Sequence, residues 1–567
     1  MYFLGLSALE HDTAAAILGD QGFFAAIEES KFERARTASG IPRAAIRFCL
    51  EHAQISWRDV DAIAVASRSW HSWARGSAFR ARSLPLAPIS SVYYESKILG
   101  ELARDLNNQR ILRLLSGEAR VPILSFDHHL CHAASAFYAS PFDRALILTC
   151  DEHGDGRSGT IAIGQGEQIR IERAITFPHS LAWVYSQVTE LIGYRPHEHE
   201  HKMQWLSLTA KPDFLDIFLE MLRRKSSLFP KLDSSFFTVG FSGRLAFSKN
   251  FYDRVGILRE PNAEISEAKR AALAASLQRA CETVITDLAQ SLRKRHGIQH
   301  LCLAGGLFLN PLLVSALEQK AGFDEIFVQP AAGNEGTALG AASLARGQKT
   351  KHPRTGPLYH LYLGPSYSNE DIKEVLDNCK ATYRWLDSDA KRISETVKLL
   401  LAGKIVGWFQ GAAEFGARAL GNRSMLASPW APYVRENLND YVKHREPFRP
   451  FALSVPEEDA GTYFEFTPPA HFMATMGRLR PEYRSLLAIH TLPEDMVRLH
   501  VVSREANAPY WNLLKAFGSQ APAPVLLNTS FNLFGEPLVL SPRHAVRSYF
   551  CSGADALVIG SFLLAKS

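Results

Sequence analysis

Apolar and polar positions follow the same order twice in the N-terminal half of the chain. Residues 2–30 predict three strands and two turns, in the segments YFLGLSA, LEHD, TAAAILG, DQG and FFAAIEES. Residues 145–176 repeat this order as ALILTC, DEHGDGRSG, TIAIG, QGEQ and IRIERAIT. In both copies the first turn contains Asp, and the second turn is a Gly-containing hairpin. The pattern therefore predicts two lobes that begin with the same strand–turn–strand unit.

A third segment, HLCLAGGLFLN at 300–310, predicts a strand that runs into Gly305–Gly306 and then a helix. Two lobes that each open on a strand–acidic hairpin–strand unit are the plan of the actin/sugar-kinase/Hsp70 ATPase superfold. In that superfold a glycine pair lets the backbone approach a nucleotide closely. Two unrelated β-meanders are the simpler alternative, and the repeat favours the superfold over them. We therefore expect an α/β protein whose N-terminal half has the two-lobed actin-like fold.

Two nucleotide-binding loops are excluded by the same pattern. The segment GDGRSG at 154–159 matches the spacing GxGxxG, but a dinucleotide-binding loop of this type must open a helix. The residues that follow, TIAIG, predict a strand instead. The chain also contains no GxxxxGK[ST] segment, so nucleotide binding of the P-loop kind is not expected.

Two polar and basic stretches interrupt this order. Residues 348–358 are rich in basic residues, Pro and Gly and predict a linker between domains at 1–347 and 359–567. The stretch 73–120 carries many basic residues, Arg75, Arg80 and Arg82 among them, and includes the helical-looking segment YYESKILGELARDL. A solvated helical insertion is favoured over a patch that binds an anionic ligand.

Composition narrows the class of protein without pointing to a function. An apolar fraction of 46% with 21% charged residues is typical of a globular protein, and 567 residues exceed one ordinary core. A net charge of +5 on so long a chain is weak support for nucleic-acid binding, and no apolar run is long enough to span a membrane. The N-terminus lacks the basic region of a signal peptide, and the seven cysteines form no CxxC pair. We expect a cytoplasmic protein without nucleic-acid or membrane partners.

The segment SFDHHLCHAASAFYAS at 125–140 is the first candidate for chemistry. If a helix begins at Asp127, His128 and His132 lie four residues apart and share one face. Asp151 ends the strand ALILTC and would face the same cleft, so it supplies a carboxylate. Two imidazoles and a carboxylate are a credible facial set for Fe(II), Mn(II) or Zn(II). A structural or surface role is the alternative for an isolated HxxxH segment.

Two further polar segments allow two interpretations each. Asn334 and Glu335, in PAAGNEGTALGAASLA, begin a helix of small residues, where they could bind an anion or simply cap the helix. In HEHEHK, at 197–202, the histidines alternate with Glu198 and Glu200. A solvated loop is favoured there over a histidine-rich metal site.

The C-terminal domain carries its basic residues on turns between aromatic residues. The segments FGARALGNRSMLASP, KHREPFRPFA and LLNTSFNLFGEPLV begin at residues 415, 443 and 526. Arginines held rigidly in this way suit bidentate binding of phosphate. A structural ion-pair network is the alternative, but the acidic residues nearby are too few to pair with all the cations. The candidate phosphate ligands are Arg418, Arg423, Lys443, Arg445, Arg449, Asn528, Thr529 and Ser530.

Taken together, these motifs resemble the antibiotic and nodulation-factor O-carbamoyltransferases. The resemblance covers nearly the whole chain and includes HDT near the N-terminus, EESKFERAR, HHLCHAASAFY, LAGGLFLN and the three C-terminal segments. It implies an actin-like N-terminal module followed by a C-terminal module with a YrdC-like core. It also implies that the C-terminal module condenses carbamoyl phosphate with ATP to give carbamoyl-adenylate and pyrophosphate. The N-terminal module then passes the carbamoyl group to a hydroxyl of a small natural product, in antibiotic or other secondary metabolism, and releases AMP.

The resemblance assigns a role to each candidate residue. It implies that His128, His132, Asp151 and Asn334 hold a divalent metal, most simply Fe(II), and that Mg(II) accompanies ATP. His11 and Asp12 would face the acceptor hydroxyl, and one of them would be its general base. The adenosine pocket would be lined by Gly305, Gly306 and Asn310. Carbamoyl phosphate and ATP would be bound by Arg418, Arg423, Lys443, Arg449, Asn528 and Ser530. The chain is also compatible with a homodimer.

Two departures from the family pattern bear on these roles. The family has an aspartate where this chain has Asn334, in GNEG, so the metal site has one negative charge fewer. In EHKMQWLS, at 200–207, Trp205 replaces a glycine of the family and would reshape the acceptor pocket. Two other hypotheses therefore stay open: an amine as acceptor, or an N-terminal half that acts only as a binding module. An isolated sugar kinase is disfavoured, because it would not need the C-terminal motifs.

Overall fold

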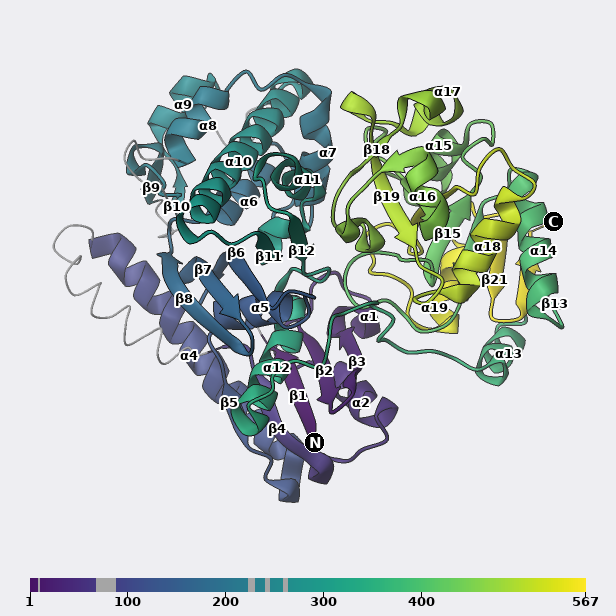
Figure 1. Cartoon of the computed structure of the whole chain (residues 1–567), viewed down its shortest axis with the longest axis horizontal. Helices are drawn as coiled ribbons and strands as arrows, with labels where there is room; N and C mark the ends of the chain where they lie inside the picture. The colour runs from purple at the N-terminus through teal and green to yellow at the C-terminus, as the bar shows by residue number, and fades with distance from the viewer. Residues whose placement is uncertain (9–10, 68–87, 223–229, 240–244, 259–263, 567) are drawn as a thin grey trace. The chain divides into compact units, whose positions relative to one another are not determined.

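The computed structural model describes the chain except residues 9–10, 68–87, 223–229, 240–244, 259–263 and 567, and except the side chains of residues 88–99 and 101–102 (Figure 1). The chain packs into two compact units. The first comprises Met1–Gly22, Ser39–Pro42 and Ile55–Pro357, and the second comprises Phe23–Ala38, Arg43–Gln54 and Leu358–Ser567. Arg75, Arg80 and Arg82, from the basic stretch 73–120, lie outside the described residues. Among the described residues no helix is both long and apolar enough to cross a membrane.

Two five-stranded sheets of the same topology organise the N-terminal half. The first has the order β3-β2-β1-β4-β5, and the second has the order β8-β7-β6-β11-β12. The central strand of each sheet is antiparallel to the strand that follows it in the chain and parallel to a later strand. The strands are β1 (Tyr2–Ser7), β2 (Ala14–Gly19), β3 (Gly22–Glu28), β4 (Val60–Val65), β5 (Ile123–Ser125), β6 (Arg144–Gly154), β7 (Arg157–Gln165), β8 (Gln168–Thr176), β11 (His300–Ala304) and β12 (Glu325–Val328). The duplicated topology confirms the repeat predicted from the sequence and the actin-like fold class.

Small residues let two helices pack closely in the first unit. Helix α12 (Thr337–Thr350) lies against β1, β2 and β4, helix α5 (His128–Phe137) lies against β6 and β11, and the two helices contact each other. A Cβ atom on Gly5 would lie 2.0 Å from the carbonyl oxygen of Ala338, and one on Gly340 would lie 1.9 Å from that of Cys131. Overpacking at either position would force the backbones apart. Helix α12 also takes up the first three residues of the predicted linker.

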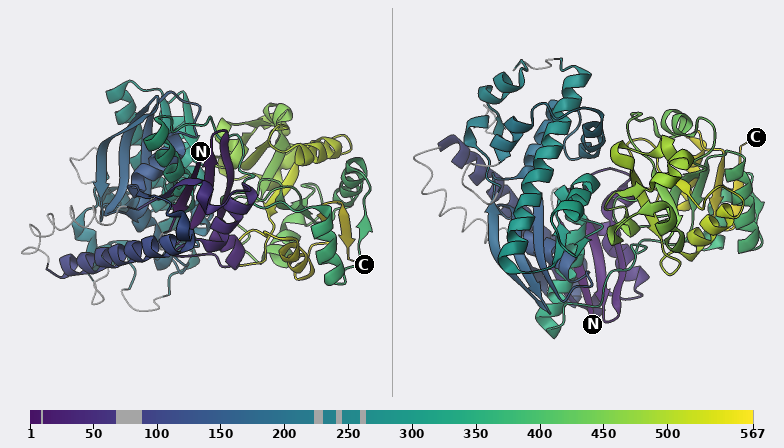
Figure 2. Two further views of the ribbon diagram at one scale, coloured as in Figure 1. Left: turned by 90° about the horizontal axis from the view of Figure 1, so that it is seen from below. Right: turned by 45° about the horizontal axis from the view of Figure 1, so that its top comes forward.

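Several helices of the first unit pack around one long helix. Helix α10 (Glu267–His296) packs against α6, α7, α8 and α11 and is the long helix of the second lobe in both figures (Figure 1, Figure 2). The other bounds are α4 (Pro88–Ser116), α6 (Leu181–Leu191), α7 (Glu200–Leu206), α8 (Leu215–Leu222), β9 (Phe237–Val239), β10 (Leu245–Phe247), α9 (Lys249–Val255) and α11 (Pro311–Lys320). Helix α4 covers YYESKILGELARDL, so this part of the predicted helical insertion is confirmed.

A ten-stranded sheet forms the centre of the second unit, with the order β13-β22-β21-β14-β15-β20-β16-β19-β18-β17. Its strands are β13 (Arg384–Trp385), β14 (Val406–Phe409), β15 (Arg423–Ala427), β16 (Ala452–Pro456), β17 (Phe464–Glu465), β18 (Gly477–Leu479), β19 (Met496–Val502), β20 (Leu526–Ser530), β21 (Ala556–Ile559) and β22 (Phe562–Ala565). The helices are α1 (Glu29–Glu33), α2 (Arg43–His52), α13 (Asn369–Asn378), α14 (Asp389–Leu401), α15 (Val434–Asn437), the π-helix η7 (Leu438–Lys443), α16 (Glu457–Tyr463), α17 (Arg484–Leu487), α18 (Ala508–Gly518) and α19 (Pro542–Phe550). The mixed α/β class is confirmed here too, whereas the YrdC-like core and the domain limits stay predictions.

Candidate functional site

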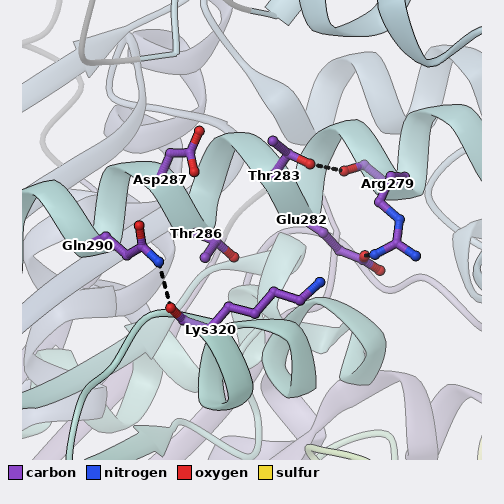
Figure 3. A pocket seen from close by; sticks show the side chains of 7 residues that line it. All are labelled: Arg279, Glu282, Thr283, Thr286, Asp287, Gln290 and Lys320. Atoms are coloured by element: carbon purple, nitrogen blue, oxygen red, sulfur yellow. Dashed lines mark hydrogen bonds and ion pairs between the residues drawn. The ribbon is translucent and has the colours of Figure 1, made fainter. Parts of the chain in front are cut away.

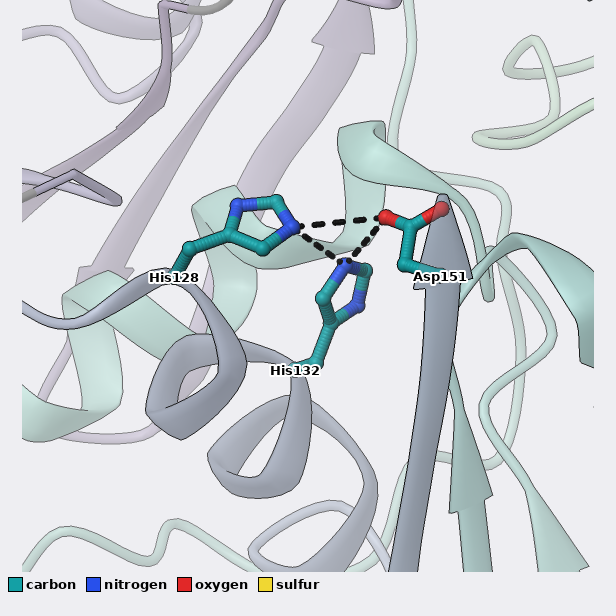
Figure 4. Close-up of side chains that lie close together, drawn as sticks. All are labelled: His128, His132 and Asp151. Atoms are coloured by element: carbon teal, nitrogen blue, oxygen red, sulfur yellow. Dashed lines mark hydrogen bonds and ion pairs between the residues drawn. The ribbon is translucent and has the colours of Figure 1, made fainter. Parts of the chain in front are cut away.

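Helix α5 begins where the sequence predicted and places two histidines on one face. Asp127 caps the helix by accepting a hydrogen bond from the Leu130 backbone N–H at 3.1 Å. The His128 backbone N–H donates to Asp155 Oδ2 at 2.7 Å, which ties the start of the helix to the β6–β7 hairpin. As expected from the helical spacing, the side chains of His128 and His132 point toward the same carboxylate, that of Asp151 on β6 (Figure 4).

The donor atoms of these three residues are spaced as metal ligands are. The Nε2 atoms of His128 and His132 lie 3.3 and 3.1 Å from Asp151 Oδ2, and 3.1 Å from each other. A cation held by bonds of about 2.0–2.2 Å requires donor separations of about 3 Å. All three side chains are buried, and the Nδ1 atoms of both histidines have no partner among the described residues. The donor set therefore fits a divalent metal ion, as the sequence predicted.

Charge is shared unevenly in this cluster. Burial alone lowers the pKa of both imidazoles, but the hydrogen bond and charge of Asp151 outweigh it at His128, whose pKa is raised. At His132 burial prevails and the pKa is lowered. Burial acts to raise the pKa of Asp151, yet the two histidines hold it well below its usual range. A carboxylate that stays ionised in a buried place needs positive charge beside it, which a bound cation would also supply.

Glycines shape the backbone around Asp151 and His128. A Cβ atom on Gly154 would lie 2.1 Å from Cδ2 of the His128 ring, and one on Gly306 would lie 3.1 Å from Asp151 Oδ1. Gly305 has φ +101°, a conformation that favours glycine, and a Cβ atom there would lie 2.3 Å from the carbonyl oxygen of Cys150. The absence of a side chain at Gly305 lets its backbone pass close to the end of β6, and the predicted role of Gly305 and Gly306 beside adenosine stays a prediction.

Asn310, the third residue predicted to line the adenosine pocket, is used inside the fold. Its Oδ1 accepts hydrogen bonds from the backbone N–H groups of Leu312 and Leu313 at 3.1 and 3.2 Å. Its Nδ2 donates to Gln278 Oε1 at 2.7 Å, and the residue is buried. These contacts make Asn310 the N-cap of α11, so the geometry favours a structural role.

His11, Asp12 and Asn334 form a second polar group in the same unit. His11 Nδ1 lies 2.7 Å from Asp12 Oδ2 and 3.4 Å from Asn334 Nδ2. The Oδ1 atom of Asn334 is buried and has no partner among the described residues, so an acceptor oxygen is left to bind something else. Burial lowers the pKa of His11, but Asp12, with Asp151 and Glu152, raises it to about 9. The charge of Asp151 raises the pKa of His11, so this polar group lies within electrostatic range of the candidate metal site formed by His128, His132 and Asp151.

The HEHEHK segment differs from the solvated loop that the sequence favoured. Helix α7 begins at Glu200, and the His197 backbone N–H donates to Glu200 Oε1 at 2.6 Å. His197 Nδ1 lies 3.1 Å from Glu152 Oε2, and its ring centroid lies 5.6 Å from that of His11. Trp205 is buried in α7. The structure therefore adds Glu152 and His197 to the surroundings of the site, and the alternation of His and Glu was the only sign of this in the sequence.

The second unit gathers its cations around Lys443, the last residue of the π-helix. The Lys443 ammonium donates to the backbone carbonyl of Ser530 at 2.8 Å and to its hydroxyl at 3.1 Å. Burial, together with the charges of Arg445, Arg449 and Arg36, holds the pKa of Lys443 well below its usual range. An anion bound here would relieve that repulsion, because it favours the charged form of each cation.

Four arginines extend this group of cations. Burial lowers the pKa of Arg498, and the positive charges of Arg418, Arg445 and Arg449 lower it further. Burial lowers the pKa of Arg418 to about 10. Arg449 Nη1 lies 3.7 Å from Glu446 Oε2, and Arg445 is held by Asn439 Oδ1 at 3.0 Å from its Nε. Sequence reasoning missed Arg498, because a single arginine in an alternating strand gives no sign of the turns it faces.

Neutral polar side chains lie on the same face of the central strands as Arg498. Asn528, Ala452 and Arg498 are direct partners across β20, β16 and β19, and Ser454 pairs with His500 two residues further along. Residues paired in this way, or two apart, share one face of a sheet. Asn528 Nδ2 donates to the Ala419 carbonyl at 3.1 Å, and burial with nearby positive charge lowers the pKa of His500 to about 3. The structure thus groups Arg418, Lys443, Arg449, Asn528 and Ser530 with Arg498.

Arg423 stands apart from that group. It is fully buried, and its guanidinium donates to four backbone carbonyls, those of Gln410, Asn422, Pro365 and Gly411, at 2.6 to 3.0 Å. Its guanidinium carbon also lies 3.7 Å from the centre of the Phe409 ring. Both terminal nitrogens are therefore occupied within the fold, and the geometry favours a structural role over the predicted binding of phosphate.

A separate surface pocket of about 440 Å³ lies along α10 beside the end of α11 (Figure 3). Gln290 Nε2 donates to the Lys320 carbonyl at 2.6 Å, and Arg279 pairs with Glu282 at 3.3 Å. Thr283, Thr286 and Asp287 complete its lining. The pocket contains none of the residues to which the sequence assigned a role.

Comparison with known proteins gives a consistent result over nearly the whole chain. The model of the carbamoyltransferase N-terminus matches residues 2–343, and that of the carbamoyltransferase C-terminus matches residues 397–566. The protein sll1178 of Synechocystis is 33% identical over 100% of this chain and 97% of its own length. Nodulation protein NolNO of Sinorhizobium fredii is 33% identical over 98% of this chain and 79% of its own. Nodulation protein NolO of Bradyrhizobium diazoefficiens is 34% identical, with 78% and 79% covered.

Proposed function

The chain belongs to the carbamoyltransferase family and is a carbamoyltransferase, and from this premise we propose that it works in two steps, of which the first consumes ATP. In the first, the second unit converts carbamoyl phosphate, ATP and water into carbamoyl-adenylate, pyrophosphate and phosphate. In the second, the first unit transfers the carbamoyl group to a hydroxyl of a small natural product, so that the new carbamate ester, AMP and a proton are released.

The observation that carries the first step is the group of cations around Lys443. Arg418 and Arg449 lie close enough to Arg498 to lower its pKa, and Arg449 also lowers that of Lys443, an arrangement that is costly unless an anion is bound. Carbamoyl phosphate and ATP bring several phosphate oxygens, and arginine binds such oxygens in pairs. Asn528 and Ser530 add neutral polar groups beside the cations, with the Asn528 amide held by Ser454 and the Ser530 hydroxyl in contact with Lys443. These residues would orient the two substrates and stabilise the charge that develops when pyrophosphate leaves.

The second step needs a polarised carbonyl and an acceptor for the hydroxyl proton. His128, His132 and Asp151 fit a divalent ion, with the free Oδ1 of Asn334 as a neutral candidate fourth ligand. When bound, such an ion polarises the carbamoyl carbonyl and offsets negative charge on the phosphate of AMP. The raised pKa of His11 favours its protonated form, so Asp12 is the candidate of this pair to take the proton of the attacking hydroxyl.

One incubation tests this function directly. The purified chain is mixed with carbamoyl phosphate, ATP, Mg(II) and a divalent transition metal, without any acceptor, and the products are separated by mass spectrometry. We expect pyrophosphate and carbamoyl-adenylate, neither of which should appear when carbamoyl phosphate is left out. If no pyrophosphate forms under metal-replete conditions, the proposed function is wrong. Adding candidate hydroxylated and amine acceptors to the same mixture identifies the acceptor class from the mass of the carbamoylated product.

A further inference from the structure

Residues 28–36, which we name the α1 segment, belong to the second unit although they lie in the N-terminal half of the sequence. Most of the preceding strand, β3, is also grouped with the second unit. Its Ala26 backbone N–H donates to the Leu363 carbonyl at 3.0 Å. Three side chains of the α1 segment contact two loops that carry or support the cations of the C-terminal site. These are the 414–423 loop, which contains Arg418, and the 532–538 loop.

Glu28 and Lys31 hold the beginning of the 414–423 loop. Their side chains form a buried ion pair, with Lys31 Nζ 2.9 Å from Glu28 Oε2. Glu28 Oε1 accepts a hydrogen bond from the Gly416 backbone N–H at 2.7 Å. Lys31 donates to the carbonyls of Glu414 and Gly416 at 2.5 and 3.0 Å. Two opposite charges thus bind the loop backbone two residues before Arg418.

The Glu414 side chain holds the backbone of the rest of the 414–423 loop. Its Oε1 accepts hydrogen bonds from the backbone N–H groups of Leu420, Asn422 and Arg423, at 2.8 to 3.1 Å. The Ala419 carbonyl in turn accepts from Asn528 Nδ2. The backbone on both sides of Arg418 is therefore fixed, on one side by the α1 segment and on the other by Glu414 and Asn528.

Arg34 holds the 532–538 loop in a similar way. Its guanidinium donates to the carbonyls of Leu538 and Pro537 at 2.5 and 2.9 Å and pairs with Glu536 at 2.9 Å. The Glu536 carbonyl accepts from Asn532 Nδ2 at 2.6 Å, and Asn532 Oδ1 accepts from the Lys443 ammonium. A chain of hydrogen bonds therefore leads from Arg34 to Lys443.

We infer that Glu28, Lys31 and Arg34 are positioning residues of the C-terminal anion site, which fix Arg418 through the 414–423 loop and Lys443 through the 532–538 loop. The inference rests on the proposed adenylate-forming function. It means that the substrate site of the C-terminal half is incomplete without a segment encoded nearly 400 residues earlier. A misplaced loop would weaken the binding of carbamoyl phosphate even though every ligand residue is still present.

The test compares full-length variants in the acceptor-free reaction that releases pyrophosphate. Arg34→Lys keeps the charge beside Glu536 but cannot bind both carbonyls, and Glu28→Gln with Lys31→Met replaces the buried ion pair by neutral groups of similar size. For both we expect the KM for carbamoyl phosphate to rise roughly tenfold, because the ligand residues are displaced. Faster hydrogen exchange should appear in the amides of residues 414–423 and 532–538.

Arg354→Gln is the matched control. Arg354 also donates to backbone carbonyls, those of Phe142 and Gly166, but it belongs to the first unit. It should leave the KM for carbamoyl phosphate unchanged. If the α1-segment variants lose only thermal stability or active fraction while KM and exchange in both loops stay at the wild-type values, the inference is wrong. If wild type itself releases no pyrophosphate, the proposed function fails instead, and the exchange measurement still decides whether the segment orders the loops.

Discussion

Asn334 brings a neutral amide to a place where the resembled family has a carboxylate. Its buried Oδ1 has no partner among the described residues, and its Nδ2 lies 3.4 Å from His11. An amide oxygen can bind a cation, but it contributes no charge. Among the four candidate ligands, His128, His132, Asp151 and Asn334, the single carboxylate would therefore be that of Asp151.

The variant Asn334→Asp should therefore bind its metal ion more tightly. We expect the affinity for Fe(II), Mn(II) or Zn(II) to rise on the order of tenfold, since ligand charge sets the affinity of such sites. Metal content after dialysis and a competition titration with a chelator measure the change. Asn107→Asp, on the exposed face of α4, is the matched control and should have no effect. An unchanged affinity in Asn334→Asp would remove residue 334 from the ligand set.

Arg423 shows that one motif can contain both a ligand and a structural residue. Arg418 and Arg423 lie five positions apart in FGARALGNRS, but only Arg423 has its guanidinium enclosed by backbone carbonyls. The sequence could not separate them, because the carbonyl partners come from residues 365, 410, 411 and 422, and carbonyls leave no trace in side-chain patterns.

Replacing Arg423 should thus cost stability rather than catalysis. Arg423→Met leaves several carbonyl oxygens without a donor, each at about 1–3 kcal/mol, so we expect the free energy of unfolding to fall by at least about 3 kcal/mol. Arg449→Met, at a partly exposed position, should change the stability little and suppress pyrophosphate release. Denaturant unfolding of both variants checks this. A stable but inactive Arg423→Met protein would return Arg423 to the substrate ligands.

At the scale of elements, the β6–β7 hairpin and helix α5 together supply the candidate metal ligands, with Asp151 on the hairpin and His128 and His132 on the helix. The sequence predicted both elements and the face shared by His128 and His132, since strand alternation and helical spacing are local signals. It did not predict how closely the hairpin approaches the His128 ring. That approach depends on the absence of a side chain at Gly154, which lies on the hairpin, whereas His128 lies on α5.

Gly154→Ala tests this approach. The added Cβ would lie 2.1 Å from Cδ2 of His128, so the imidazole must leave its present position beside Asp151. We expect loss of most of the bound metal, with a destabilisation of about 1–3 kcal/mol from overpacking. Gly100→Ala, whose added Cβ would have no described atom within 4 Å, should keep both metal and stability. If Gly154→Ala retained the wild-type metal content, His128 would not be a ligand in its present position.

For the whole molecule, the repeat predicted the two sheets of the N-terminal half, while the domain limits at 1–347 and 359–567 stay predictions. Residues 23–38 and 43–54 pack with the C-terminal unit, through partners such as Glu414 and Leu538. Contacts between residues 383 to 504 positions apart have no periodicity to reveal them. In HEHEHK, His197 lies in an exposed turn, as a solvated loop would, but helix α7 begins at Glu200. The pairing of His197 with Glu152 of the β6–β7 hairpin could not be read from local spacing.

In the proposed division of labour, the cations of the second unit bind the substrates for adenylate formation, and His128, His132 and Asp151 of the first unit serve the transfer of the carbamoyl group. Pyrophosphate release without acceptor, measured for wild type, Arg449→Ala and His132→Ala, tests it most directly. Arg484→Ala, an exposed arginine paired with Asp495, is the control for loss of charge. We predict that Arg449→Ala abolishes pyrophosphate release, whereas His132→Ala retains it and loses only transfer to the acceptor. Equal loss of pyrophosphate release in both variants would contradict the division of labour between the two units.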